Sequence, residues 1–129
     1  MHLAALLSFL LAAALGITMA VNHVRGVPSG TAFGIAHGLA AVSGLVFLIT
    51  SFVFLDVEIG WWILAGFLLT AAGGVYLFTR QQKGEPWPGL VLVAHGSLAI
   101  LSIVLLAVWI AGPRGQEEGV PVPVEAVPD

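Results

Sequence analysis

Cysteine is absent from this chain, and charged residues make up only 9% of it. Without cysteine the protein cannot form disulfides, thiolate metal sites or iron–sulfur clusters. Lys and Arg together number four, so we expect no nucleic-acid partner. The apolar share of 59% and the mean hydropathy of +1.05 lie far outside the range of soluble domains. The composition therefore favours a lipid bilayer as the surrounding solvent.

Every charged residue lies outside four apolar runs, which cover residues 3–22, 31–55, 59–79 and 88–111. Each run has about the 20 residues that a helix needs to cross about 30 Å of hydrocarbon. The connectors between them are short, at residues 23–30, 56–58 and 80–87. Short connectors make consecutive spans antiparallel neighbours. We therefore predict an all-α fold, a transmembrane four-helix bundle with up-down-up-down topology in residues 1–111.

The ends of the spans suggest how the chain sits in the membrane. Arg25, Arg80 and Lys83 lie in the first and third connectors, whereas Arg114 lies on the opposite side. The positive-inside rule then places those connectors in the cytoplasm and both termini outside a cell inner membrane. The first run could be read as a secretory signal, but no basic residue precedes it, so we expect a span. Four Trp residues near span ends favour interfacial belts.

The last segment, residues 112–129, differs in composition from the bundle. It is acidic and rich in Pro and Val, which favours an extended segment over a packed element. A disordered terminus is the alternative. An extended tail would offer a contact site for a partner protein.

The chain carries an internal repeat, in which residues 1–50 align without a gap on residues 59–108. The displacement is 58 positions, and many identities are Leu or Ala, which composition alone would produce. The informative matches are Gly16 with Gly74, Gly26 with Gly84, Pro28 with Pro86, His37 with His95, and Gly38 with Gly96. They keep one register through helix, loop and helix. We therefore predict two copies of one helical hairpin, related by an axis along the membrane normal.

Two histidines occupy equivalent places in this repeat, in the sequences Ala-His-Gly around His37 and His95. Each lies about two turns inside its span, so the two imidazoles are expected at equal depth on diagonally opposed helices. An unpaired polar ring in hydrocarbon is expensive, which makes both histidines candidates for a functional site. The alternative is that each ring only bonds a backbone carbonyl or a hydroxyl. The paired geometry favours axial ligation of one haem b, whose iron takes two nitrogens on opposite faces.

Glycines lie at the same level as the histidines. By helical rise, Gly16 is level with His37 and Gly74 with His95, where the missing side chain would let a macrocycle pass. Gly38 and Gly96 would let the histidine helices approach it. Helix packing is the alternative use of these glycines.

The haem propionates need cations or water at the cytoplasmic end. The candidate partners there are Arg25, Arg80, Lys83, Asn22 and His23, and the alternative is that the three cations only determine topology. His23 aligns with a glutamine, and His2 has no match in the repeat, so we expect neither to be an axial ligand and no second haem.

This arrangement resembles the membrane-integral b-type cytochromes, in architecture and in the two Ala-His-Gly sites. The resemblance implies an electron-transfer subunit without substrate chemistry of its own, working with other redox subunits of a respiratory or photosynthetic complex and with quinone as a candidate partner. Two other classes stay open: a cofactor-free scaffold or assembly subunit, and a small proton or metal transporter. The lack of any carboxylate inside the spans disfavours the transporter.

Overall fold

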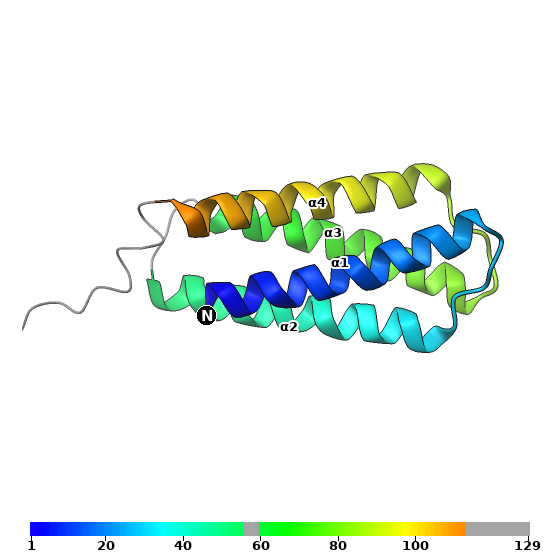
Figure 1. Ribbon diagram of the computed structural model, residues 1–129, viewed down its shortest axis with the longest axis horizontal. Helices are drawn as coiled ribbons and strands as arrows, with labels where there is room; N and C mark the ends of the chain where they lie inside the picture. Colours follow the sequence, from blue (N-terminus) through cyan, green and yellow to red (C-terminus); the bar gives the residue numbers. More distant parts are fainter. Residues whose placement is uncertain (56–59, 113–129) are drawn as a thin grey trace, which may run out of the picture.

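The computed structural model describes residues 1–55 and 60–112 of the chain and contains no strand within them. The described residues form four helices, α1 (His2–Val24), α2 (Thr31–Leu55), α3 (Gly60–Gln82) and α4 (Gly89–Ala111). Figure 1 shows them side by side along one long axis, with the α1–α2 and α3–α4 connections at the end away from the N-terminus. The all-α prediction is confirmed.

The helix bounds follow the hydropathy closely, with differences at the connector end. α2 has the predicted bounds, but α1 continues to Val24 and α3 continues to Gln82, so Arg80 is helical and not part of a connector. The prediction ended these helices too early because polar residues can extend a helix beyond the hydrocarbon. The predicted connector 56–58 and residues 113–129 of the predicted tail lie outside the described residues.

Both connectors begin with the same backbone motif. Gly26 and Gly84 have φ angles of 69° and 67°, a conformation that glycine adopts without strain because it has no Cβ. The amide one residue beyond each glycine donates back to the helix, from Val27 to the Asn22 carbonyl and from Glu85 to the Arg80 carbonyl, both at 2.9 Å. These bonds satisfy carbonyls that the helix ends would leave unpaired. The two repeat-related glycines therefore terminate α1 and α3 in the same way.

The four helices pack in a ring. Backbone contacts join α1 with α2, α2 with α3, α3 with α4, and α4 with α1, whereas within the described residues the backbones of α2 and α4, and those of α1 and α3, do not meet. The helices α2 and α4 thus lie diagonally across the bundle. A residue of α2 can meet a residue of α4 only through side chains that reach the central axis.

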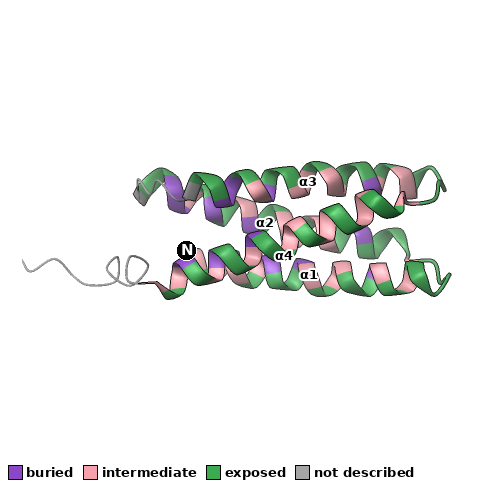
Figure 2. Ribbon diagram, turned by 90° about the horizontal axis from the view of Figure 1, so that it is seen from above, coloured by how far each residue is buried: buried purple, intermediate pink, exposed green. Residues whose placement is uncertain are grey.

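The buried core lies mainly in the half of the bundle that contains the N-terminus, and we call this half the closed half (Figure 2). Its members come from all four helices: Ala5, Phe9, Leu48, Phe52, Ile63, Leu64, Phe67, Leu106 and Trp109. Trp109 is only 8% exposed and packs edge-on against His2, with ring centroids 4.4 Å apart. The expectation that Trp109 belongs to an interfacial belt is therefore wrong, because its ring fills the space between helices.

All four helices are long and apolar enough to cross a membrane. In the most apolar stretch of each span, 22% of the residues of α1, α2 and α3 and 11% of those of α4 are buried inside the bundle. The remaining apolar surface needs lipid or another protein around it, as a multi-pass membrane protein requires.

Candidate functional site

His37 of α2 and His95 of α4 meet across the central axis. Their ring centroids lie 6.2 Å apart, and their ring planes are inclined at 66°. Both residues are half-buried. Because α2 and α4 are diagonal, this contact joins the two hairpins through the middle of the bundle.

Each imidazole is held by one hydrogen bond to the backbone of the neighbouring helix. Nδ1 of His37 lies 2.8 Å from the carbonyl oxygen of Ala12 in α1, and Nδ1 of His95 lies 2.9 Å from that of Thr70 in α3. A carbonyl can only accept, so each Nδ1 carries the proton and donates it. In the neutral ring Nε2 is then the unprotonated nitrogen, and within the described residues neither Nε2 has a hydrogen-bond partner. Nε2 of each ring is therefore the nitrogen that has a lone pair available for another partner.

The two hydrogen bonds are equivalent by position. Ala12 and Thr70 are separated by the same 58 positions as His37 and His95, and each bond joins residues 25 apart in the chain. The side chain at position 12 differs from that at position 70, but a carbonyl acceptor is present at any residue. Each histidine therefore does bond a backbone carbonyl, which is the alternative to metal ligation in the sequence analysis. The bond uses Nδ1 only, so Nε2 of each ring is still available.

Gly16 and Gly74 lie against the histidine rings. A β-carbon built on Gly16 would lie 3.1 Å from Cε1 and 3.3 Å from Nδ1 of His37, and one built on Gly74 would lie 3.1 Å from Cε1 of His95. In an α-helix the Cα–Cβ bond tilts toward the N-terminus, over the preceding turn. The absence of this atom uncovers the carbonyl four residues earlier, which is the one that accepts the histidine bond. The glycines are therefore level with the histidines, as the helical rise indicates.

The other glycines of the sequence prediction have different surroundings. A β-carbon on Gly38 or Gly96 would meet nothing within 4 Å in the described structure. Gly73, by contrast, would place a β-carbon 3.5 Å from Nδ1 of His95. Gly73 was not among the predicted site residues, because its counterpart in the internal repeat is Leu15 and not a glycine.

The α1–α3 diagonal is bridged at the closed half by an aromatic pair. Phe9 and Phe67 stack with ring centroids 3.7 Å apart and planes inclined at 6°. The two residues are again 58 positions apart, and both are buried. A β-carbon on Gly44 would lie within 2.9 Å of the Phe9 ring, so this level has no spare room. The stack fills the axis between α1 and α3 in the half away from the connectors.

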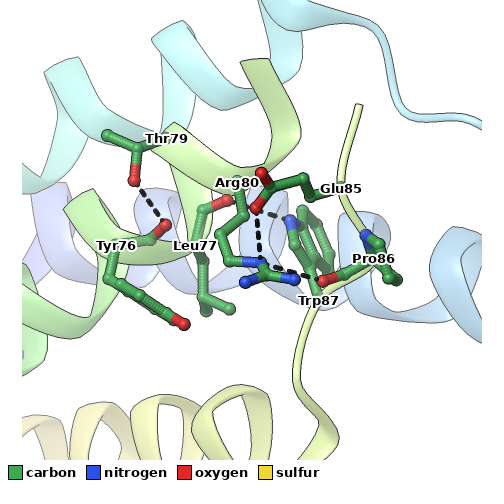
Figure 3. A network of polar contacts seen from close by, with 7 residues as sticks. All are labelled: Tyr76, Leu77, Thr79, Arg80, Glu85, Pro86 and Trp87. Atoms are coloured by element: carbon green, nitrogen blue, oxygen red, sulfur yellow. Dashed lines mark hydrogen bonds and ion pairs between the residues drawn. The ribbon is translucent and has the colours of Figure 1, made fainter. Parts of the chain in front are cut away.

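One of the three predicted cations, Arg80, is engaged at the connector end (Figure 3). Its Nε lies 3.3 Å from Oε2 of Glu85 and donates to the Pro86 carbonyl at 3.1 Å. Nε1 of Trp87 donates to the Leu77 carbonyl at 3.0 Å, which fastens the connector to α3. Arg25 and Lys83 are exposed. Arg80 is therefore neutralised locally, whereas the other two cations face outward.

A shallow cavity of about 350 Å³ opens between the two connectors. Polar side chains in its wall include His23, Ser29 and Gln81, and Trp87 stands beside them. Nε2 of Gln81 donates to the Ser29 carbonyl at 2.8 Å, a bond that ties α3 to the first connector. Oε1 of Gln81 is buried and accepts no hydrogen bond from the described residues. His23 packs against Trp87 with ring centroids 4.9 Å apart, well away from the histidine pair in sequence and placement.

Comparison with protein-family models, with curated proteins and with solved structures finds no match to this chain.

Proposed function

We propose that the protein is a membrane-integral electron-transfer subunit that holds one haem b between Nε2 of His37 and Nε2 of His95. The observation that carries this proposal is the separation of the two rings, 6.2 Å between centroids. Two metal–nitrogen bonds of about 2 Å and the size of the imidazoles place ring centroids about 6 Å apart when both rings bind one metal. Haem supplies one-electron chemistry when it is bound.

The hydrogen bonds at Nδ1 support the same assignment. Histidines that bind metals almost always donate the other ring N–H to a carboxylate, a backbone carbonyl or water, which fixes the tautomer and the ring orientation. His37 and His95 both do so.

A macrocycle suits these ligands better than a bare metal ion. Within the described residues no group of three or more His, Cys, Asp or Glu side chains could hold a metal. Structural zinc takes four protein ligands and catalytic zinc usually takes three. Haem brings four equatorial nitrogens of its own and asks the protein only for the axial pair, so two histidines suffice.

We further propose that the bundle has up-down-up-down topology and consists of two copies of one hairpin. The support is a set of features repeated at a displacement of 58 positions: the positive φ angles of Gly26 and Gly84, the histidine bonds to the backbone, and the stacked pair Phe9 and Phe67. An axis along the membrane normal would relate the copies and pass between His37 and His95.

The propionates of this haem would point toward the connectors. His37 lies seven residues from Gly30 along α2, which corresponds to about 10 Å of helical rise. The cavity between the connectors lies at the level of Gly30, which is part of its wall. Arg25, Arg80 and Lys83 are the cations nearest in sequence, and a β-carbon on Gly38 or Gly96 would meet nothing within 4 Å.

The proposed role is to relay electrons. An iron with two axial histidines has no open position for a substrate, so we expect no substrate chemistry at this site. A single haem near one end leaves the closed half without a redox group. The chain therefore needs other redox subunits of a membrane complex, with quinone as a candidate partner at the connector end. We place it in a cell inner membrane with both termini outside, on the charge bias of the connectors.

A cofactor-free scaffold subunit is the second candidate. The bonds from the two histidines to backbone carbonyls favour it, because they give each ring a partner without any cofactor. This candidate leaves Nε2 of both rings unexplained.

An absorption spectrum of the purified full chain separates the two candidates. The haem proposal predicts a Soret band and sharp α and β bands after reduction, with one haem per chain by the pyridine haemochrome assay. A colourless protein, expressed with haem in sufficient supply, would overturn it and favour the scaffold.

A further inference from the structure

We infer that Gly16 and Gly74 are positioning residues that set the planes of the two histidine rings at a steep angle to each other, by uncovering the carbonyls of Ala12 and Thr70. The inference rests on the proposed haem site and adds to it the orientation of the axial ligands. It concerns a property that ligand identity alone does not determine, since two imidazoles can bind iron with their planes parallel or crossed.

The ring planes are inclined at 66° in the structure. Each ring is fixed at two places, through its Cβ by its own helix and through Nδ1 by the neighbouring helix. A ring held at both places cannot turn freely about the line from Nε2 to a bound metal. We therefore expect the protein to keep the two ring planes at a steep angle when both rings bind one metal.

The angle between axial imidazole planes controls the electronic structure of ferric haem. Each imidazole donates into the iron d orbital that lies perpendicular to its own plane. Parallel rings act on one of the two relevant orbitals and separate their energies, whereas crossed rings act on both and bring the energies together. Crossed rings give a strongly anisotropic electron paramagnetic resonance (EPR) signal with one large g value, and parallel rings give a rhombic signal with three well-separated g values.

The glycines make this orientation possible because they leave room at the acceptor. A β-carbon at position 16 would lie 3.1 Å from Cε1 and 3.3 Å from Nδ1 of His37, which is tighter than ordinary van der Waals contact. The His37 ring would have to turn away from the Ala12 carbonyl. At position 74 the β-carbon would lie 3.1 Å from Cε1 but 3.8 Å from Nδ1 of His95, so that ring has a looser constraint.

The first test is low-temperature EPR of the oxidised, haem-loaded full chain. We expect a single large-g, strongly anisotropic low-spin signal. A rhombic low-spin signal would overturn the inference and leave the proposed haem ligation standing, since the haem would still be low-spin. A chain without haem would overturn both.

The second test applies the same measurement to Gly16→Ala, with Gly89→Ala as the matched control. A β-carbon on Gly89, the first residue of α4, would meet nothing within 4 Å. We expect Gly16→Ala to retain low-spin haem with most of the wild-type EPR signal replaced by one of smaller maximum g, and Gly89→Ala to keep the wild-type signal. An unchanged signal in Gly16→Ala would overturn the positioning role. If Gly16→Ala binds no haem, the same EPR comparison is made with Gly74→Ala, whose β-carbon crowds Nδ1 of His95 less. An unchanged signal in that variant would overturn the positioning role.

Discussion

The two halves of the bundle are built differently although the same four helices run through both. The closed half is filled by side chains of the protein, with Phe9 stacked on Phe67 and Trp109 packed against His2. The half near the connectors, which we call the histidine half, brings His37 and His95 to the axis and lines their surroundings with glycine. Large apolar side chains of the core cluster are confined to the closed half.

This difference separates the part of the bundle that holds the main packed core from the part that would hold the proposed haem. In lipid, helices associate through close packing and interhelical hydrogen bonds, because burial from water contributes little. The closed half provides the packing, and the histidine half provides two hydrogen bonds that also fix ring tautomers. Substitutions in the two halves should therefore affect different measurements.

Replacing either of the proposed axial histidines should have the largest effect on the cofactor. We expect His37→Ala or His95→Ala to abolish the low-spin haem spectrum, because one remaining ligand cannot complete the axial pair. His2→Ala is the control in the closed half, where the ring contacts Trp109, and it should leave the spectrum intact. A normal low-spin spectrum in His37→Ala would show that the ligand assignment is wrong.

Replacing the glycines of the histidine half by larger residues should have the second-largest effect on haem binding. Gly16→Leu and Gly74→Leu are expected to reduce haem content to a small fraction while insertion into the membrane continues, because lipid tolerates leucine but the imidazole beside each glycine leaves no room for it. Gly89→Leu, at a position with open surroundings, is the control. Haem content and membrane-extracted protein are measured together, and full occupancy in both variants would contradict the prediction.

Truncating Phe9 or Phe67 should have the opposite effect to the histidine and glycine variants. The protein should lose stability, and its haem spectrum should be retained. Phe→Ala at a buried position costs about 3–5 kcal/mol in soluble cores, and the cavity contribution persists in lipid. We expect Phe9→Ala and Phe67→Ala to lower the midpoint of thermal unfolding in detergent by several degrees, with haem still bound at that lower stability. The double variant should be less destabilised than the sum of the two, by about 0.5–1.5 kcal/mol for an aromatic pair. Strict additivity would argue that the rings do not stack.

The smallest effect is expected from a connector cation. Arg25→Gln removes a positive charge on the propionate side, which should disfavour the reduced haem and lower its reduction potential by tens of millivolts, given that a tenfold change in relative affinity corresponds to about 59 mV for one electron. Replacing Arg80 and Glu85 together by Gln should shift the potential less, because the pair that is removed carries no net charge. Potentiometric titration at low and high salt measures both variants, and the shifts should shrink with salt. A larger shift for the Arg80 and Glu85 double replacement than for Arg25→Gln would contradict the assigned pairing.

Hydropathy predicted the helices because a span must be apolar along its whole length, and α2 has the predicted bounds. It could not predict the rotation of each helix about its own axis, since a helix apolar on all sides has no periodic signal. The repeat supplied the missing information for His37 and His95, which meet as expected. The same repeat aligns Phe9 with Phe67, but a match between two apolar residues could not be distinguished from chance. Their stacking was therefore not predicted.

The hydrogen-bond acceptors of the histidines could not be predicted from residue types. Ala12 and Thr70 contribute backbone carbonyls, which every residue has, so the residue types at these positions do not identify the acceptors. Gly16 and Gly74 are the indirect signal, because a glycine four residues after an acceptor leaves that carbonyl accessible. The engagement of Arg80 by Glu85 was also missed, since it depends on where α3 ends.

The placement of one histidine in each hairpin has a consequence for how the protein is made. The first hairpin carries His37 and the second carries His95, and the rings approach only across the α2–α4 diagonal. A hairpin that has entered the membrane alone can offer the proposed haem only one of its two axial ligands. Tight cofactor capture would then begin only when the second hairpin has been synthesised, inserted and docked, so that haem loading would report completed assembly to the cell's quality control.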